Sequence, residues 1–417
     1  MADVRPFRCV RPAADVASQV AALPYDVYSR KEAKEAAASN PLSFLNIDRP
    51  ETQFPDDFDM YDSRVYEKAR EMLLARMEDG TFLTERSNAY FIYELTMDGR
   101  RQTGIVACAS VDDYLNGVIR KHENTREEKE LDRIRHVDVT GAHTGPIFLV
   151  YRASREISRI TGEAEKEASL YDFVSEDGIR HRVWKIGEAG QVQALQDAFA
   201  RIPALYIADG HHRAASAVKV GLKRREEHPG YTGKEEFNYF LSVLFPDDHL
   251  MIMPYNRVVK DLNGLSGEEF LQKINGAFDV EEVGKAGISP FSPSQKGTFG
   301  LLLDGVWYKL TVKEEIKAEA GADPVKSLDV SILQDCLLGP VLGIQDPKTD
   351  RRIGFIGGIR GLSELERRTK EDMRAAFSMY PTSIQELLAV ADAGRLMPPK
   401  STWFEPKLRS GLFIHML

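Results

Sequence analysis

The chain has 417 residues, 43% of them hydrophobic and 29% charged, and this composition is typical of a globular protein with two or three domains. The formal net charge of -9 argues against a general nucleic-acid-binding protein, although a local basic site is still compatible with it. No apolar run approaches the roughly 18 residues of a membrane-spanning helix, and the N-terminus shows no apolar signal core. Three scattered cysteines predict free thiols, so we expect a cytoplasmic protein.

Helical and strand patterns alternate through the first 200 residues. We predict a short strand over Val4–Val10, a hairpin from Ala89–Leu95 and Arg101–Val111, a buried strand over Gly145–Tyr151 and two short strands between Ser169 and Ile186. The predicted helices cover Ser29–Ala38, Asp62–Asp79 and Gln191–Arg201. This order predicts the α/β (α+β) class with a mixed sheet decorated by helices.

Polar residues in the N-terminal loops form a further group of candidates. Asp26 follows Leu23–Tyr25, and Asn40 and Ser43 precede a short apolar run, while Thr144 stands before the strand at 145–151. Such polar loops between apolar anchors can bind a substrate. From the residues alone, a structural turn explains them better.

A basic segment between residues 120 and 136 is the first region that predicts chemistry. Thr125 and Glu128 have capping-box spacing, so a helix should begin there. On that helix the basic residues fall within an arc of roughly 80°. They are Arg126, Lys129, Arg133 and His136. Such stacked charges repel one another unless an anion lies before them, although on charge alone a solvated face explains them equally well. Five of the nine histidines lie in or near this segment or in Leu205–Arg213, and this clustering favours an active site; they are His122, His136, His143, His211 and His212. Lys121, His122 and Glu123, which precede the helix, could face the same anion.

The stretch Leu205–Arg213 is the most informative part of the chain. Four mostly apolar residues predict a buried strand, Asp209-Gly210 a tight turn, and the Ala-rich sequence from Ala214 a helix. The N-terminus of a helix has free N–H groups and a positive dipole end, so it suits an anion. The neighbouring side chains that can act on a phosphate are His211, His212 and Arg213. A capped helix with exposed histidines is the alternative interpretation.

The second half of the chain shows a different series of predicted elements. Phe237–Phe245 and Leu250–Val259 predict a hairpin, and Thr298–Leu303 with Val306–Val312 predicts another. Helices are expected over Gly267–Asn275 and Leu328–Leu342, and strands over Phe278–Val283 and Arg352–Ile356. We therefore expect a catalytic region over residues 1–262 and an α+β domain over residues 263–417.

The C-terminal tail supplies a third group of candidates. Lys400, Ser401 and Thr402 offer a cation and two hydroxyls on a Pro-stiffened loop, which could close over a phosphate, although a basic surface tail explains them about as well. The spacing is not that of a P-loop. Zincin, dinucleotide-binding and nucleophile-elbow motifs are also missing from the chain.

Several of these motifs together resemble those of known protein families. Gly210, His212 and Arg213 match the phosphate-binding turn of the ParB/sulfiredoxin-like superfamily. The chain as a whole resembles the family called domain of unknown function 1015. The matching segments are Pro24-Tyr-Asp26, Asn40-Pro-x-Ser-Phe44, Lys121-His-Glu-x-Thr125, residues 144–146, Asp209–Arg213 and Pro399-Lys-Ser-Thr402. The resemblance implies a ParB/sulfiredoxin-like core with extra N- and C-terminal elements.

That superfamily includes kinases that phosphorylate free L-serine. By resemblance, Glu123 is the acidic base or orienter, Asp209 holds Mg²⁺ or substrate, and His212 and Arg213 grip the donor phosphates, with His122 as a further catalytic candidate. We therefore expect a kinase that makes O-phosphoserine from ATP, ADP or pyrophosphate. Small molecules are the expected ligands, without nucleic acid or membrane, and a homodimer is one option for the assembly. A phosphatase for O-phospho amino acids and a non-enzymatic nucleotide switch of the ParB kind are the alternatives.

Overall fold

The computed structural model describes residues 1–125 and 127–417, and within helix α6 it leaves aside the side chains of residues 128 and 129. The chain forms two compact units. Unit 1 consists of Met1–Leu250 and Pro406–Leu417, and unit 2 consists of Met251–Glu405. The last twelve residues therefore return to the unit that contains the N-terminus.

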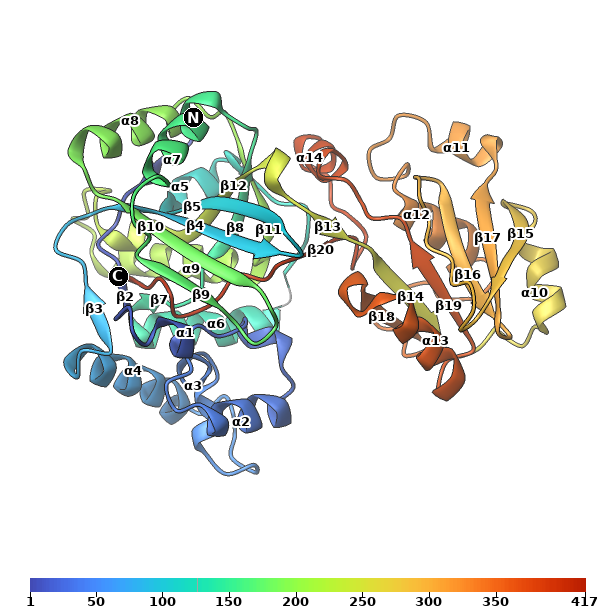
Figure 1. Cartoon of the computed structure of the whole chain (residues 1–417), viewed down its shortest axis with the longest axis horizontal. Helices are drawn as coiled ribbons and strands as arrows, with labels where there is room; N and C mark the ends of the chain where they lie inside the picture. The colour runs from blue at the N-terminus through green and yellow to red at the C-terminus, as the bar shows by residue number, and fades with distance from the viewer. Residues whose placement is uncertain (126) are drawn as a thin grey trace. The chain divides into compact units, whose positions relative to one another are not determined.

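Unit 1 is built on a mixed sheet of nine strands (Figure 1). Its order is β6 (Ile119–Arg120), β11 (Leu205–Asp209), β8 (Ile147–Tyr151), β12 (Tyr239–Pro246), β5 (Arg100–Ser110), β4 (Tyr90–Met97), β10 (Arg180–Ile186) and β9 (Tyr171–Val174), with β1 (Val4–Arg5) on β5. The pairs β6–β11 and β8–β12 are parallel and the other pairs are antiparallel. Short strands pair beside this sheet, β2 (Val10–Pro12) with β3 (Phe82–Thr84) and β7 (Ala142–His143) with β21 (His415–Met416).

Helices surround the sheet of unit 1 and bury its apolar residues. The longer ones are α2 (Arg30–Ser39), α4 (Ser63–Glu78), α6 (Glu127–Thr140), α7 (Arg155–Ala164), α8 (Ala189–Phe199) and α9 (His211–Glu227). The short ones are α1 (Ala17–Val20), η1 (Tyr25–Val27), α3 (Leu45–Asp48), η2 (Pro50–Gln53), α5 (Val111–Leu115), η3 (Glu236–Asn238) and η4 (Asp247–His249). The Ser216 hydroxyl on α9 donates to the Glu130 carbonyl on α6 at 3.1 Å, and Tyr66 on α4 donates to Asp132 on α6 at 2.9 Å. These contacts tie α4, α6 and α9 together.

Unit 2 contains a six-stranded antiparallel sheet. The order is β15 (Phe278–Lys285), β17 (Val306–Val312), β16 (Thr298–Leu303), β19 (Ala375–Met379), β14 (Tyr255–Val259) and β18 (Ile353–Gly357), and β13 (Ile252–Met253) pairs with β20 (Trp403–Phe404). The helices are α10 (Gly267–Ile274), α11 (Glu314–Ala320), α12 (Asp329–Leu333), η5 (Gln334–Leu338), η6 (Gly358–Arg360), α13 (Gly361–Glu371) and α14 (Ile384–Asp392). Trp307 is fully buried in this unit.

The expected mixed α/β class is confirmed, and so are the hairpins β4–β5 and β16–β17. The expected hairpin from Phe237–Phe245 and Leu250–Val259 is wrong. Strand β12 belongs to the sheet of unit 1, whereas Tyr255–Val259 pairs with β18 and β19 in unit 2. Both segments are apolar and β-rich, so their pattern could not tell which sheet each joins. The division between the units falls after Leu250, twelve residues before the expected boundary at 262.

Candidate functional site

A strand, a tight turn and a helix form the first part of the site. Strand β11 is buried over Leu205–Ala208 and ends at Asp209, and helix α9 begins at His211. Gly210 between them has φ 90° and ψ 30°, a left-handed conformation that glycine adopts without strain. The helix begins three residues earlier than its Ala-rich sequence predicts. The expected strand, turn and helix are therefore present, and the helix N-terminus follows directly after Asp209.

The Asp209 carboxylate lies between a backbone donor and a lysine. Its Oδ1 accepts the Gly210 N–H at 2.8 Å, and its Oδ2 is 3.1 Å from Lys407 Nζ. Partial burial acts against ionisation, but Lys407 and then Arg213 outweigh it and lower the pKa of Asp209. The side chain is half-exposed, with 50% of its surface open. Asp209 is thus a charged carboxylate that a ligand or a cation can reach.

Two histidines and Glu123 lie together beside this turn. The rings of His122 and His211 meet edge to face with centroids 4.6 Å apart, and both side chains are buried. His211 Nε2 accepts the His122 backbone N–H at 3.5 Å, so His211 Nδ1 carries the proton. That Nδ1 lies 4.0 Å from Glu123 Oε2. Glu123 is 38% exposed, which leaves its carboxylate accessible to a ligand.

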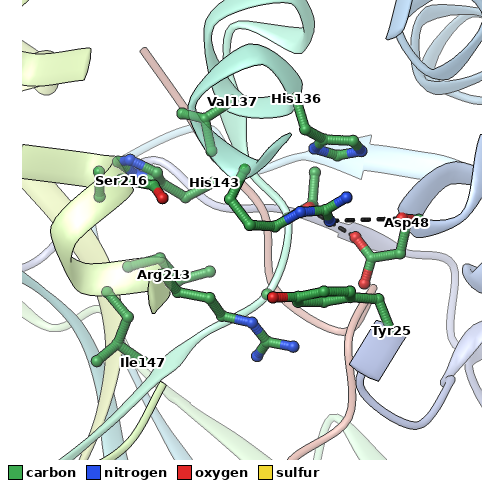
Figure 2. Close-up of a pocket in the computed structure, with 13 residues that line it drawn as sticks. Tyr25, Asp48, His136, Val137, His143, Ile147, Arg213 and Ser216 are labelled. Carbon is green, nitrogen blue, oxygen red and sulfur yellow. Dashed lines mark hydrogen bonds between the residues drawn. The ribbon is translucent and has the colours of Figure 1, made fainter. Parts of the chain in front are cut away.

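A small cavity forms the second part of the site. It has a volume of about 30 Å³, and its polar lining comes from Tyr25, Asp48, Arg133, His136, His143, Thr144, Arg213 and Ser216 (Figure 2). Its walls are contributed by η1, α3, α6, β7 and α9. One water-sized group needs roughly 10–15 Å³ of such space, so the cavity fits the end of a small molecule rather than a whole nucleotide.

Two guanidinium groups lie over the ring of Tyr25 at this cavity. The distance from Cζ to the ring centroid is 4.1 Å for Arg133 and 5.3 Å for Arg213. Arg133 is buried and pairs with Asp132 at 2.8 Å. Arg213 donates to the Pro146 carbonyl at 3.2 Å, but no carboxylate among the described residues lies within ion-pair distance of it. A guanidinium has five N–H donors, so Arg213 can still bind an anion.

Helix α6 turns part of its predicted basic arc inward. Arg133 and His136 are buried, so the solvated-face interpretation is wrong for these two residues. His136 Nε2 donates to the Ile47 carbonyl at 2.9 Å. Burial and the charge of Arg133 lower the pKa of His136, so it is a neutral hydrogen-bonding group rather than the cation that the sequence predicts.

The other predicted site residues lie in different surroundings. Thr144 lines the cavity and donates to Asp48 Oδ1 at 2.8 Å. Asn40 and Ser43 accept the backbone N–H groups of Leu42 and Leu45, which are local loop bonds. Asp26 begins the first turn of η1, and Lys121 is exposed with its Nζ 6.0 Å from the centre of the Tyr114 ring. His212 is half-buried, and its carbonyl accepts the Ser216 hydroxyl at 2.7 Å.

Some predicted residues fall outside this region of the structure. Arg126 and the side chain of Lys129 lie outside the described residues. Lys400, Ser401 and Thr402 belong to unit 2, where the Lys400 carbonyl accepts from Arg257 at 3.0 Å and Ser401 donates to the Pro398 carbonyl at 2.6 Å. Their predicted phosphate-binding role stays a prediction.

Tyr25, Asp48, His143 and Lys407 contribute to the site but were not predicted as site residues. Tyr25 precedes the candidate Asp26 and His143 precedes the candidate Thr144, but none of the four stands in a helix-start pattern. Tyr25 and Asp48 reach the cavity through η1 and α3, and Lys407 reaches Asp209 across 198 residues. Only their position beside Arg213 and Asp209 identifies them.

His122 provides a test of the electrostatics of this site. Burial lowers its pKa from 6.5 to about 4, against the opposing effect of Asp209. The unfolded chain therefore binds this proton at a higher pH than the folded chain. The neutral ring of His122 therefore makes its full contribution to the free energy of unfolding above pH 6.5. This contribution, about 3 kcal/mol, is lost as pH falls toward 4.

We expect histidine NMR to show a neutral His122 at pH 6. In urea unfolding, the free energy of unfolding should fall between pH 7 and pH 4 by about 3 kcal/mol less for His122→Gln than for the wild type. The variant His228→Gln at the exposed end of α9 is the matched control. An imidazole of His122 that titrates near pH 6.5 would contradict this prediction.

In the described ranges 1–125 and 127–417, no helix is long and apolar enough to cross a membrane. Among those same residues, no cluster of three or more His, Cys, Asp or Glu side chains is arranged to hold a metal ion.

The family of the chain follows from its sequence. The model of the family described as protein of unknown function (DUF1015) matches residues 4–331, which is more than three quarters of the chain. The chain belongs to the DUF1015 family. The resemblance seen in its motifs is thereby confirmed, and the match includes every residue of the cavity and of the turn at Gly210.

This DUF1015 chain is also similar to several solved structures. A conserved hypothetical protein from Pyrococcus furiosus is 13% identical, with 74% of this chain and 94% of that chain covered and a TM-score of 0.33. Free serine kinase in complex with AMP is 13% identical, with 74% and 92% covered and a TM-score of 0.33. SbnI with C-terminal truncation from Staphylococcus aureus is 11% identical, with 73% and 85% covered and a TM-score of 0.37. No curated protein matches the chain.

Proposed function

We propose that this DUF1015 chain is a phosphotransferase that moves a phosphoryl group from ATP, ADP or pyrophosphate to the hydroxyl of free L-serine. The observation that carries the proposal is the guanidinium of Arg213, which has no described carboxylate within ion-pair distance and lies at the N-terminal turn of α9. An unpaired arginine beside free helix N–H groups is a strong site for a phosphate or a carboxylate.

Phosphoryl transfer depends mainly on positioning and on charge neutralisation, and the site offers both. The turn at Gly210 and the N-terminus of α9 would hold donor phosphates, while Lys407 adds a cation beside Asp209. Glu123 is accessible, and its carboxylate lies 4.0 Å from the protonated Nδ1 of His211. Glu123 would take the proton of the serine hydroxyl as the new O–P bond forms.

Mg²⁺ would neutralise the phosphates of the donor. In nucleotide sites this ion is commonly held by one or two carboxylates together with phosphate oxygens and water, so a prebuilt three-ligand cluster is not required. Asp209 has the accessible, charged carboxylate that such binding needs. The Asp209 carboxylate would then contact both Lys407 and the metal ion.

A transfer assay tests the proposal. The purified chain with Mg²⁺ would be incubated with each of ATP, ADP and pyrophosphate, together with L-serine or another amino acid, and phosphoamino acids would be measured by mass spectrometry. We expect O-phosphoserine with one donor. Hydrolysis of O-phosphoserine without synthesis would instead favour a phosphatase, and donor binding without any transfer would favour a nucleotide switch. Either result would overturn the kinase proposal.

A further inference from the structure

Three titratable side chains form a hydrogen-bonded chain that ends at the Tyr25 cavity. Glu236 Oε2 lies 2.7 Å from His415 Nε2, and His415 Nδ1 lies 3.1 Å from His143 Nδ1. The antiparallel pairing of β7 with β21 places His143 directly opposite His415, and their rings stack with centroids 5.4 Å apart. The sheet register therefore fixes the geometry of the two histidines.

The carboxylate at one end determines where the protons lie. Because the Glu236 carboxylate accepts, His415 Nε2 must carry a proton. When both rings are neutral, His415 Nδ1 is then an acceptor, and His143 Nδ1 must donate to it. Burial keeps the pKa of His143 well below its ordinary value, so its ring is neutral. His143 Nε2 is consequently left without a proton, as a hydrogen-bond acceptor.

This acceptor is buried, and nothing in the described part of the chain bonds to it. His143 is 6% exposed, lines the Tyr25 cavity, and has no hydrogen-bond partner at Nε2 among residues 1–125 and 127–417. An unpaired buried acceptor destabilises a fold, so its persistence needs an explanation. A ligand that donates a hydrogen bond from within the cavity would supply the missing partner.

The remaining charges of the cavity define that ligand. Arg213 has no ion-pair partner among the described residues and can bind an anionic group. Asp48 is 2% exposed, lines the same cavity, and receives the Thr144 hydroxyl on Oδ1. An acceptor imidazole and a buried carboxylate favour a cationic donor. The cavity is therefore complementary to a small molecule that carries one anionic and one cationic group.

We propose that the cavity binds the α-carboxylate and α-ammonium groups of a free amino acid, and that His143 Nε2 accepts a hydrogen bond from the ammonium group. Arg213 binds the carboxylate, and His415 and Glu236 are positioning residues that hold His143 in the required tautomer. The inference rests on the proposed function for the identity of the amino acid. Beyond the proposed function, it identifies the atoms by which the cavity distinguishes an amino acid from a hydroxy acid.

The variant His143→Asn tests the assignment, because asparagine keeps a group near the Nδ1 position and removes Nε2. Calorimetry on the full chain would compare L-serine with 3-hydroxypropionate, which lacks the amino group, and with ethanolamine, which lacks the carboxylate. We expect the variant to bind serine about 10- to 100-fold more weakly and 3-hydroxypropionate with unchanged affinity. His228→Asn, at the far end of α9, is the matched control and should bind as the wild type does.

Glu236 provides the test of the positioning role. We expect Glu236→Ala to weaken serine binding without affecting 3-hydroxypropionate, and Glu236→Gln to restore it, because the amide oxygen still accepts from His415. Combined with His143→Asn, the alanine change should add no further loss, since Glu236 acts through His143. In ¹⁵N NMR of the wild type, His143 Nε2 should have the shift of an unprotonated nitrogen and should move when serine is added.

Several outcomes separate this inference from the proposed function. Equal losses for serine and 3-hydroxypropionate in His143→Asn, or a His143 Nε2 signal that serine does not move, would overturn the inference even if O-phosphoserine is formed. Loss of amino-group selectivity together with no phosphate transfer from any donor would support the inference and overturn the kinase. A wild type that binds no free amino acid would overturn the inference, while the transfer assay judges the proposed function separately.

Discussion

Lysine at position 213 is expected to lower kcat/KM for L-serine by about 100-fold or more. Among the described residues, Arg213 has one hydrogen bond, to the Pro146 carbonyl, which leaves other donors of its guanidinium for an anion at the turn that follows β11. Lysine keeps the charge but loses the planar, two-pronged geometry that matches a phosphate or a carboxylate. Steady-state kinetics with a varied L-serine concentration at a fixed donor concentration would measure the effect.

Arg224→Lys is the matched control for this variant because it makes the same change near the other end of α9. We expect its kcat/KM to equal that of the wild type. Thermal unfolding midpoints of both variants would show whether the fold is retained. If Arg213→Lys folds normally and keeps its full kcat/KM, Arg213 does not contact the reacting molecules.

Glutamine at position 123 is expected to lower kcat by about 10²- to 10⁴-fold and to leave the Kd of the nucleotide unchanged. The amide has nearly the same shape as the carboxylate but cannot take the hydroxyl proton of the acceptor. Glu123 lies 4.0 Å from His211 Nδ1, so a neutral side chain can remain in the same place. Turnover and nucleotide titration on the same preparation would measure the two quantities.

Glu127→Gln, at the exposed start of α6, is the control for position 123. It removes one carboxylate from the same surface region and should change neither kcat nor Kd. A Glu123→Gln protein with wild-type turnover would rule out a role as base. If both the wild type and Glu123→Gln bind nucleotide without turnover, the protein is instead a nucleotide switch.

The sequence predicted the local structure correctly where a few neighbouring residues determine it. The buried strand, the left-handed Gly210 and the helix that begins at His211 are all encoded within nine residues, because each depends on local backbone preference. It failed where an apolar segment could pair with more than one partner. The pattern of Tyr255–Val259 predicts a strand, but not that this strand belongs to unit 2.

The sequence by itself determined the DUF1015 family, the mixed α/β class and the strand, turn and helix start at Leu205–Arg213. Only the tertiary structure decided which side chains face that turn. Tyr25, Asp48 and Arg133 meet at one cavity from three separate helices, and His415 reaches His143 across 272 residues through the pairing of β7 with β21. Burial then converts His136 and His143 from potential cations into neutral groups. Such desolvation depends on the packing of distant segments, which no local pattern records.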